Sequence, residues 1–173
     1  ANELSFIKFI ESNNDNNQIS WNTATISNDR ANFNYTIDKQ TIGIIGTRPE
    51  GFDTCDYEKD EVTNKLNVSL INLDLDDLFN EAKEVHADTI TATKKTISGY
   101  LQGTEELVQD EFDKSISIFH GLENLKEKHN LDAFAIRCWP ETFTEYGCAS
   151  CGPMAMMNEK KVSCACEADV LGG

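Results

Sequence analysis

The sequence predicts an α/β protein with a parallel sheet and flanking helices. Short apolar runs typical of buried strands recur along the chain, and stretches with the apolar spacing of helices separate them. Strand and helix alternate at the spacing of βα units, which favours parallel strands joined by right-handed crossovers. We therefore expect a doubly wound sheet over residues 41–129, with further βα elements after it.

The predicted elements alternate along most of the chain. Strands are expected at residues 42–45, 68–73, 131–138 and 162–166, and helices at residues 58–66, 76–85, 104–129 and 149–158. The first strand is an isoleucine-rich run that Gly46 ends, and the second has largely alternating apolar positions. The next helix carries Asp76 and Asp77 in its first turn, where negative charge interacts favourably with the helix dipole.

The longest predicted helix, over residues 104–129, has one apolar face. That face is formed by Leu107, Phe112, Ile116, Ile118, Phe119, Leu122 and Leu125. An apolar strand at residues 131–138 follows and completes a third βα unit. The last helix is rich in methionine, and the last strand is followed at once by acidic residues.

Residues 1–39 give no comparable pattern. The apolar residues at 4–10 suit one face of a short helix, and the polar run at residues 12–17 indicates a loop. Residues 21–39 mix Thr, Asn and Asp without a clear period. We interpret residues 1–39 as a poorly defined N-terminal segment that acts as a linker, with one helix of indefinite position.

Charge and cysteine content narrow the functional class. The net charge is −15, whereas a protein that binds nucleic-acid phosphates needs a basic footprint. No apolar stretch reaches the length of a membrane span, and the first residues lack the basic region of a signal peptide. Five of the six cysteines fall between Cys138 and Cys166, which argues against a disulfide framework. We expect a cytoplasmic protein without nucleic-acid or membrane partners.

Polar side chains follow two of the predicted strands. Trp139 and Glu141 come at the end of one strand, where Pro140 forces a turn, and Glu167 and Asp169 directly follow the next. Ligands of open parallel sheets bind beyond the carboxyl ends of the strands. Carboxylates at that edge suit a hard cation or acid–base chemistry. The alternative for each carboxylate alone is a solvated loop residue or a helix cap.

The cysteines offer a second hypothesis. Cys148 and Cys151, followed by Cys164 and Cys166, have the paired spacing of a four-thiolate zinc site. A helix and a strand are predicted around these pairs, whereas the cysteines of such zinc sites usually lie in tight turns, so the predicted elements argue against the zinc site. A free cysteine is also commonly a small buried apolar residue.

These motifs resemble those of the L-fucose isomerase-like family. The resemblance rests on Ala135-Ile-Arg-Cys-Trp-Pro-Glu141, Gly147-Cys148-Ala149, Cys151-Gly-Pro, Met157-Asn158-Glu159, Cys164-Ala-Cys-Glu-Ala-Asp-Val-Leu-Gly172 and, earlier, Ile44-Ile-Gly-Thr-Arg-Pro-Glu-Gly-Phe-Asp-Thr-Cys55. It implies a flavodoxin-like α/β middle domain at residues 40–130. The beginning of a second α/β domain, the metal-dependent catalytic domain, follows at residues 131–173.

The resemblance also implies aldose–ketose isomerisation through an enediol, assisted by a divalent cation, usually Mn²⁺. The family holds its metal with a Glu, an Asp and a His. By motif, Asp169 matches the Asp, and Glu141 matches the Glu, with Glu145 as an alternative. Glu141 and Asp169 are therefore the expected metal ligands and the expected catalytic residues.

Sugar contacts are expected at Arg48, Trp139 and Glu167. Members of the family form symmetric oligomers with shared active sites, so we expect a homo-oligomer in which Arg48 is a candidate for a neighbour's site. No histidine follows His129, and the chain stops at a turn after a strand. We expect a fragment of a sugar isomerase that is inactive alone. The alternative is a non-catalytic sugar-binding or structural-zinc α/β module.

Overall fold

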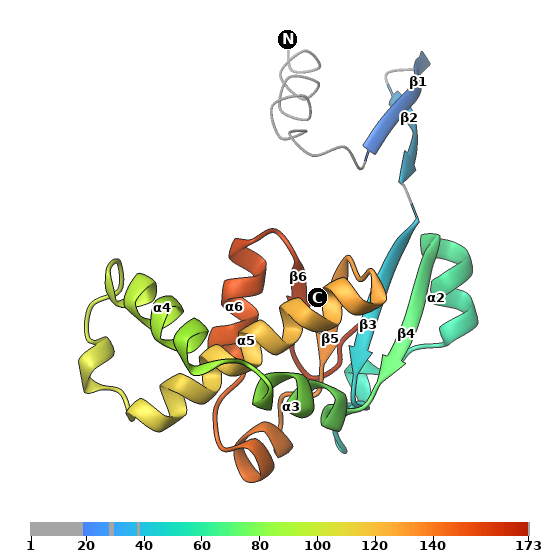
Figure 1. Ribbon diagram of the computed structural model, residues 1–173. Helices are drawn as coiled ribbons and strands as arrows, with labels where there is room; N and C mark the ends of the chain where they lie inside the picture. Colours follow the sequence, from blue (N-terminus) through green and yellow to red (C-terminus); the bar gives the residue numbers. More distant parts are fainter. Residues whose placement is uncertain (1–18, 28–29, 38, 173) are drawn as a thin grey trace. The chain divides into compact units, whose positions relative to one another are not determined.

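The computed structural model describes residues 19–27, 30–37 and 39–172. The chain divides into two units, residues 1–39 and residues 40–173 (Figure 1). The second unit is built on an all-parallel sheet with the strand order β4-β3-β5-β6. Its strands are β3 (Gln40–Ile45), β4 (Val68–Leu73), β5 (Ala133–Ile136) and β6 (Ser163–Ala165). The predicted α/β fold with a parallel sheet is confirmed.

The strand order creates a switch point between β3 and β5. From β3, the chain passes through α2 (Lys59–Leu66) to β4 on one side. It returns through α3 (Leu75–Lys83), α4 (Ala87–Ser98) and α5 (Gln109–His129) to β5 on the other side, and α6 (Cys151–Glu159) leads to β6. Numbered along the chain, the order is 2-1-3-4. It matches the first four strands of a flavodoxin-like sheet, whose ligands bind where the order reverses.

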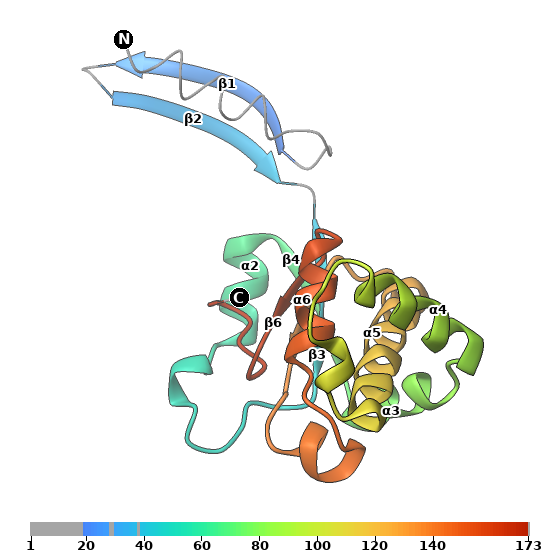
Figure 2. The ribbon, with the colours of Figure 1, turned by 90° about the vertical axis from the view of Figure 1, so that its left-hand side faces the viewer.

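The two faces of the sheet carry different layers. Figure 2 shows α2 on one side of the sheet and α3, α4 and α5 on the other. Ile45, Phe134 and Ile136 belong to the larger core, beneath α3, α5 and α6, whereas Ile44 and Ala135 belong to the core that includes α2. This division follows from the alternation of side chains along each strand.

Helix α5 is the centre of the larger core. Ile118, Leu122 and Leu125 are fully buried, as the predicted apolar face requires. At Gly121, a Cβ would lie 3.0 Å from the backbone N of Ala82, so glycine allows α5 and α3 to approach closely. Each fully buried leucine of this core contributes about 2 kcal/mol of hydrophobic stabilisation.

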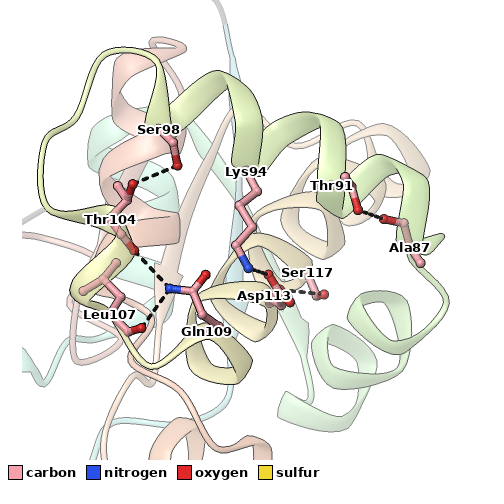
Figure 3. A network of polar contacts seen from close by, with 9 residues as sticks. All are labelled: Ala87, Thr91, Lys94, Ser98, Thr104, Leu107, Gln109, Asp113 and Ser117. Carbon is pink, nitrogen blue, oxygen red and sulfur yellow. Dashed lines mark hydrogen bonds and ion pairs between the residues drawn. The ribbon is translucent and has the colours of Figure 1, made fainter.

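Helix α4 is absent from the sequence prediction. Its repeated threonines lose side-chain freedom in a helix and leave a weak apolar pattern. Contacts with α5 support it instead: Lys94 forms an ion pair with Asp113 (Figure 3). Tertiary contacts therefore stabilise a helix that local propensity does not predict.

The helix predicted over residues 104–129 begins later, at Gln109. A 3₁₀ turn, η2 (Thr104–Glu106), precedes it. The amide of Gln109 donates to the carbonyls of Thr104 (3.1 Å) and Leu107 (2.8 Å), as Figure 3 shows. Leu107 is consequently half exposed and does not belong to the apolar face, contrary to the prediction.

The last part of the second unit continues the same sheet. β5 pairs with β3, and β6 pairs with β5. The boundary expected near residue 130 therefore falls inside one sheet and does not separate two sheets. The physical reason is that β5 is apolar on both of its faces, which suits a strand inside a parallel sheet.

The first unit contains an antiparallel hairpin, which the sequence interpretation of residues 21–39 did not predict. β1 (Ile19–Ser27) pairs with β2 (Arg30–Ile37) along its length, with one irregularity. Phe33, Tyr35 and Ile37 alternate in β2, and β1 is rich in Thr and Ile. This short period-two signal, with β-branched and aromatic residues, is typical of strands.

The helix considered for residues 4–10 lies outside the described residues. In the part of the chain that the structure describes, no helix combines the length and the apolar character needed to cross a membrane.

Candidate active site at the carboxyl edge of the sheet

Arg137 joins the two loops that flank the switch point. Its backbone N donates to the carbonyl of Ile45, at the end of β3 (2.8 Å). Its guanidinium Nη1 donates to the carbonyls of Thr47 (3.2 Å) and Arg48 (3.3 Å) in the next loop. Gly46 has φ +77°, and a Cβ there would lie 2.9 Å from the Cβ of Arg137. Glycine thus permits the close approach, and one arginine fixes the spacing of both loops.

Glu141 pairs with the same guanidinium. The Nε of Arg137 donates to one carboxylate oxygen at 2.7 Å, and Nη2 lies 2.6 Å from the other. Such two-point geometry is the strong form of an arginine–carboxylate pair. The hydrogen bond from Arg137 lowers the pKa of Glu141. The same bond raises the pKa of Arg137, and the negative charges of Glu167 and Glu145 raise it further. Glu141 is therefore ionised at neutral pH.

A π-helical turn, η3 (Thr142–Tyr146), begins directly after Glu141. Thr142 is fully buried, and its hydroxyl donates to the carbonyl of Cys138, which fastens the turn to the end of β5. Trp139 and Phe143 are left on the surface, with their rings edge to face and 5.3 Å between centroids. The exposed aromatic pair therefore presents an apolar surface next to Glu141.

The loop after β6 presents Glu167 and Asp169 beside the end of β5. Glu167 and Ala168 have left-handed backbone conformations, with φ of 56° and 53°, which residues other than glycine rarely adopt. The backbone N of Ala168 donates to the carbonyl of Ile136 at 2.9 Å. The carboxylate of Asp169 accepts two backbone N–H groups, at 3.2 and 2.8 Å. A cavity of about 270 Å³, lined by Cys55, Ala165, Cys166, Glu167, Asp169 and Gly172, opens beside both carboxylates.

Two thiols lie against Glu167. The Sγ of Cys138 donates to Oε1 of Glu167 at 3.3 Å, and it lies 3.3 Å from the Sγ of Cys166. Burial, together with the neighbouring Cys166 and Glu167, raises the pKa of Cys138 to about 12. The other oxygen of Glu167, Oε2, is buried and has no hydrogen-bond partner among the described residues. Sequence reasoning missed this cluster because the two cysteines come from different strand ends.

The four-thiolate zinc site is not formed. Cys148 is buried, and Cys151 is exposed as the first residue of α6, so the pair is split between core and solvent. Burial raises the pKa of Cys148, and that of Cys164 to about 12. Among the described residues, the side chains that converge as possible metal ligands are Cys138, Cys166 and Glu167.

Arg48 lies in the loop after β3, as predicted, but its charge is compensated locally. Its guanidinium is 2.8 Å from Asp53 and 3.9 Å from Asp56, and both carboxylates are well exposed. Exposed pairs of this kind contribute little free energy, so Arg48 can exchange these partners for a ligand. Glu145, the alternative to Glu141, is exposed within η3.

A larger cavity of about 610 Å³ lies in the helix layer, between α4, α5 and α6. Apolar side chains dominate its lining, including Ile97, Tyr100, Leu101, Val108, Phe112 and Met156. The carboxylates of Glu111 and Glu159 also line this apolar groove. Sequence reasoning missed it because the groove depends on α4, which the pattern does not predict.

The donor types at the carboxyl edge fit a hard divalent cation such as Mn²⁺. Glu141 and Asp169 supply carboxylate oxygens, which this ion prefers. Glu141 would have to exchange Arg137 for the cation. His86 caps α4, and His120 binds Thr93 and Glu123 in the helix layer, and neither belongs to the described side chains that converge as possible metal ligands.

The sequence matches no protein-family model. It is similar to proteins named sulfoquinovose isomerase from Alkalicoccus urumqiensis (30% identical over 136 residues), Clostridium sp. (strain MSTE9) (25% over 128 residues) and Priestia aryabhattai (28% over 137 residues). The matched regions cover 74–76% of this chain but 29% of each relative. The chain thus spans less than a third of these relatives, and it is similar to part of proteins that are named as isomerases of a sugar.

Proposed function

We propose that this chain is part of an aldose–ketose isomerase that acts on a sugar or sugar derivative with the help of a divalent cation, Mn²⁺ first among the candidates. The observation that carries the proposal is that carboxylates follow the ends of two adjacent parallel strands: Glu141, paired with Arg137, after β5, and Glu167 and Asp169, which line one cavity, after β6. That edge is where open parallel sheets bind ligands. The relatives named sulfoquinovose isomerase support the same class of reaction.

The residues of the edge suit the steps of such a reaction. Glu141 and Asp169 would hold the cation, which, when bound, supplies polarisation of the sugar carbonyl. Asp169 lines the cavity and would take a proton from one carbon and return it to the neighbouring carbon, by way of an enediol. Glu141 is ionised through its bond to Arg137, which suits a ligand better than a base. Trp139 and Glu167 would contact the sugar ring and a hydroxyl group.

The relatives' name points to a sulfonated sugar as substrate. A sulfonate is an anion that a guanidinium binds through two parallel hydrogen bonds. Arg48 is our candidate for this contact. Breaking its ion pairs with the exposed Asp53 and Asp56 to bind a sulfonate costs little free energy. Replacing Arg48 with Met should therefore raise the KM for a sulfonated sugar more than the KM for its uncharged analogue.

The test is an isomerase assay of the full-length protein. The enzyme would be depleted of metal, supplied with Mn²⁺, and incubated with sulfoquinovose, glucose and other aldoses, with the ketose products detected by NMR. We expect turnover that needs the cation and favours the sulfonated sugar. Glu141→Gln should lower kcat/KM about 100-fold or more, because it removes a ligand of the cation that polarises the carbonyl, and Glu145→Gln should leave it nearly unchanged. The reverse pattern would assign the ligand to Glu145, and binding without any turnover would favour a sugar-binding module.

We also propose that residues 1–173 alone do not turn over sugar. Two carboxylates without a third protein ligand hold a cation weakly and do not fix its geometry. We expect the full-length enzyme to be a symmetric homo-oligomer, measurable by light scattering. Micromolar Mn²⁺ binding by the 173-residue chain in calorimetry, together with multiple turnovers, would contradict the proposal for the isolated chain.

A further inference from the structure

We propose that Cys138, Cys166 and Glu167 form a binding site for a thiophilic divalent cation such as Zn²⁺. Cys138 follows β5, and Cys166 and Glu167 follow β6, so adjacent strand ends bring the three side chains together. One donor atom from each lies within 4.8 Å of the other two. The site uses neither of the proposed Mn²⁺ ligands, Glu141 and Asp169, but it shares Glu167, the proposed sugar contact, with the isomerase site.

The three donor atoms form a triangle of the size that a tetrahedral metal requires. The Sγ atoms of Cys138 and Cys166 are 3.3 Å apart, and Oε1 of Glu167 is 3.3 Å from the first and 3.9 Å from the second. In a tetrahedral zinc site, bonds of about 2.3 Å to sulfur and about 2.1 Å to oxygen separate two sulfurs by about 3.8 Å and sulfur from oxygen by about 3.6 Å. Each observed edge therefore needs a change of no more than about 0.5 Å.

Among the described residues, no cationic side chain forms an ion pair with Glu167, whose Oε1 accepts a hydrogen bond from Cys138. Its Oε2 is buried without a hydrogen-bond partner among the described residues, which is costly for a carboxylate. The nearby Arg137 directs its hydrogen bonds to Glu141 and to the loop after β3. A cation between the thiols and Glu167 would supply the missing counter-charge.

The surroundings leave room for a fourth ligand. Cys166 and Glu167 line the cavity of about 270 Å³ at the carboxyl edge. Three protein ligands with one open position are typical of zinc sites at which a water molecule or another small ligand exchanges. Sulfur donors favour Zn²⁺ and Co²⁺ over Mn²⁺, so this site and the carboxylate site select different ions.

Cobalt is the probe that tests the site. The full 173-residue chain, reduced and freed of metal, would be titrated with Co²⁺ and followed by absorption. We expect one equivalent to bind, with thiolate-to-cobalt charge-transfer bands in the near ultraviolet and the intense visible bands of tetrahedral coordination. One equivalent of Zn²⁺ should then bleach these bands.

The variants separate the three ligands. Cys166→Ala, at an exposed position, and Cys138→Ala should each weaken the charge-transfer bands and lower affinity, with circular dichroism confirming the fold. Glu167→Gln should keep the bands and lower affinity at least about tenfold, a loss that even outer-shell changes can cause. Cys151→Ala, another exposed cysteine, is the matched control and should bind as the wild type does.

Several results would overturn the site. They are the absence of charge-transfer bands, unchanged bands in Cys166→Ala, unchanged affinity in Glu167→Gln, or loss of the bands in Cys151→Ala. A disulfide between Cys138 and Cys166 in reducing buffer would overturn it as well. None of these results bears on the isomerase assay, and a failed isomerase assay leaves the cobalt titration standing.

Discussion

The apolar groove in the helix layer is larger than the cavity at the carboxyl edge, but the smaller cavity has the more reactive lining. The groove has about 610 Å³, against about 270 Å³ at the edge. Its lining consists mostly of side chains from α4, α5 and α6 that cannot bind a cation or move a proton. The smaller cavity lies where two adjacent strands end in carboxylates, thiols and an arginine.

This difference shows that the direction of the parallel strands determines where polar and ionisable side chains come together. Parallel strands place all their carboxyl ends at one edge, so residues far apart in sequence, such as Glu141 and Asp169, reach the same edge. The groove lies in the helix layer to one side of the sheet, where apolar side chains such as Tyr100, Leu101 and Val108 stay partly exposed. The volume of a cavity alone indicates only imperfect packing, whereas polar side chains that converge on a cavity indicate a candidate functional site.

The largest expected contrast is in activity. Asp169→Asn in the full-length protein should lower kcat/KM about 10²- to 10⁴-fold, because a carboxylate that moves a proton contributes about that much. Glu159→Gln, a carboxylate of the groove, is the matched control and should change kcat/KM less than about twofold. Steady-state kinetics with Mn²⁺ decides, and similar losses in both variants would remove the distinction between the two cavities.

Arg137→Met should destabilise the protein by about 2 kcal/mol, because it leaves Glu141 unpaired and releases the loop after β3. Lys65→Met, which removes an exposed i,i+4 pair with Glu61, should cost less than about 0.5 kcal/mol. Urea denaturation of both variants measures the difference. Equal costs would mean that Arg137 does not organise the edge.

The stability contribution of Glu141 should depend on pH. A carboxyl group with a lowered pKa in the fold stabilises it above the ordinary value of 4.5 and loses this contribution as the pH falls through the folded pKa. Glu141→Gln should therefore cost about 1 kcal/mol near neutral pH and progressively less in acid. Denaturation of variant and wild type across this range checks the sign, and a constant difference would refute the pairing.

Polar substitutions in the groove should have the smallest effects. Leu101→Ser and Leu107→Ser change side chains that are about half exposed, so stability should shift by less than about 0.5 kcal/mol. Activity should stay unchanged, while binding of a dye that reports exposed apolar surface should fall. A loss of activity comparable to that of Asp169→Asn would place the groove in the reaction.

Much of the fold of residues 40–173 is readable from the sequence, because a buried parallel sheet leaves short apolar strands and a strong helix pattern. The isoleucines of β3 and the apolar face of α5 are such signals. Helix α4 and the β1–β2 hairpin were missed, since their threonines and asparagines carry weak periodicity. Helix α4 depends on tertiary contacts with α5, and the hairpin shows only a short alternation of side chains in β2. Neither feature gives the extended apolar periodicity on which the prediction relied.

The candidate site was readable only in part. The strand-end positions of Glu141, Glu167 and Asp169 follow from the pattern alone. The partner of Glu141 does not, because Arg137 precedes it by four residues and reaches it only through the turn at Trp139 and Pro140. The thiol cluster likewise requires the pairing of β5 with β6, which no local motif encodes.

The most direct test of the proposed function is isotope exchange in D₂O. The full-length enzyme, supplied with Mn²⁺, would convert a sulfonated sugar while NMR follows the hydrogen on the carbon beside the carbonyl. Proton transfer by a carboxylate at the carboxyl edge, by way of an enediol, predicts deuterium at C1 of the ketose product and at C2 of the recovered aldose, because the proton held by the carboxyl group exchanges with solvent before it is returned. This exchange should be lost in Asp169→Asn. Absence of deuterium from both carbons, or undiminished exchange in Asp169→Asn, would contradict the account.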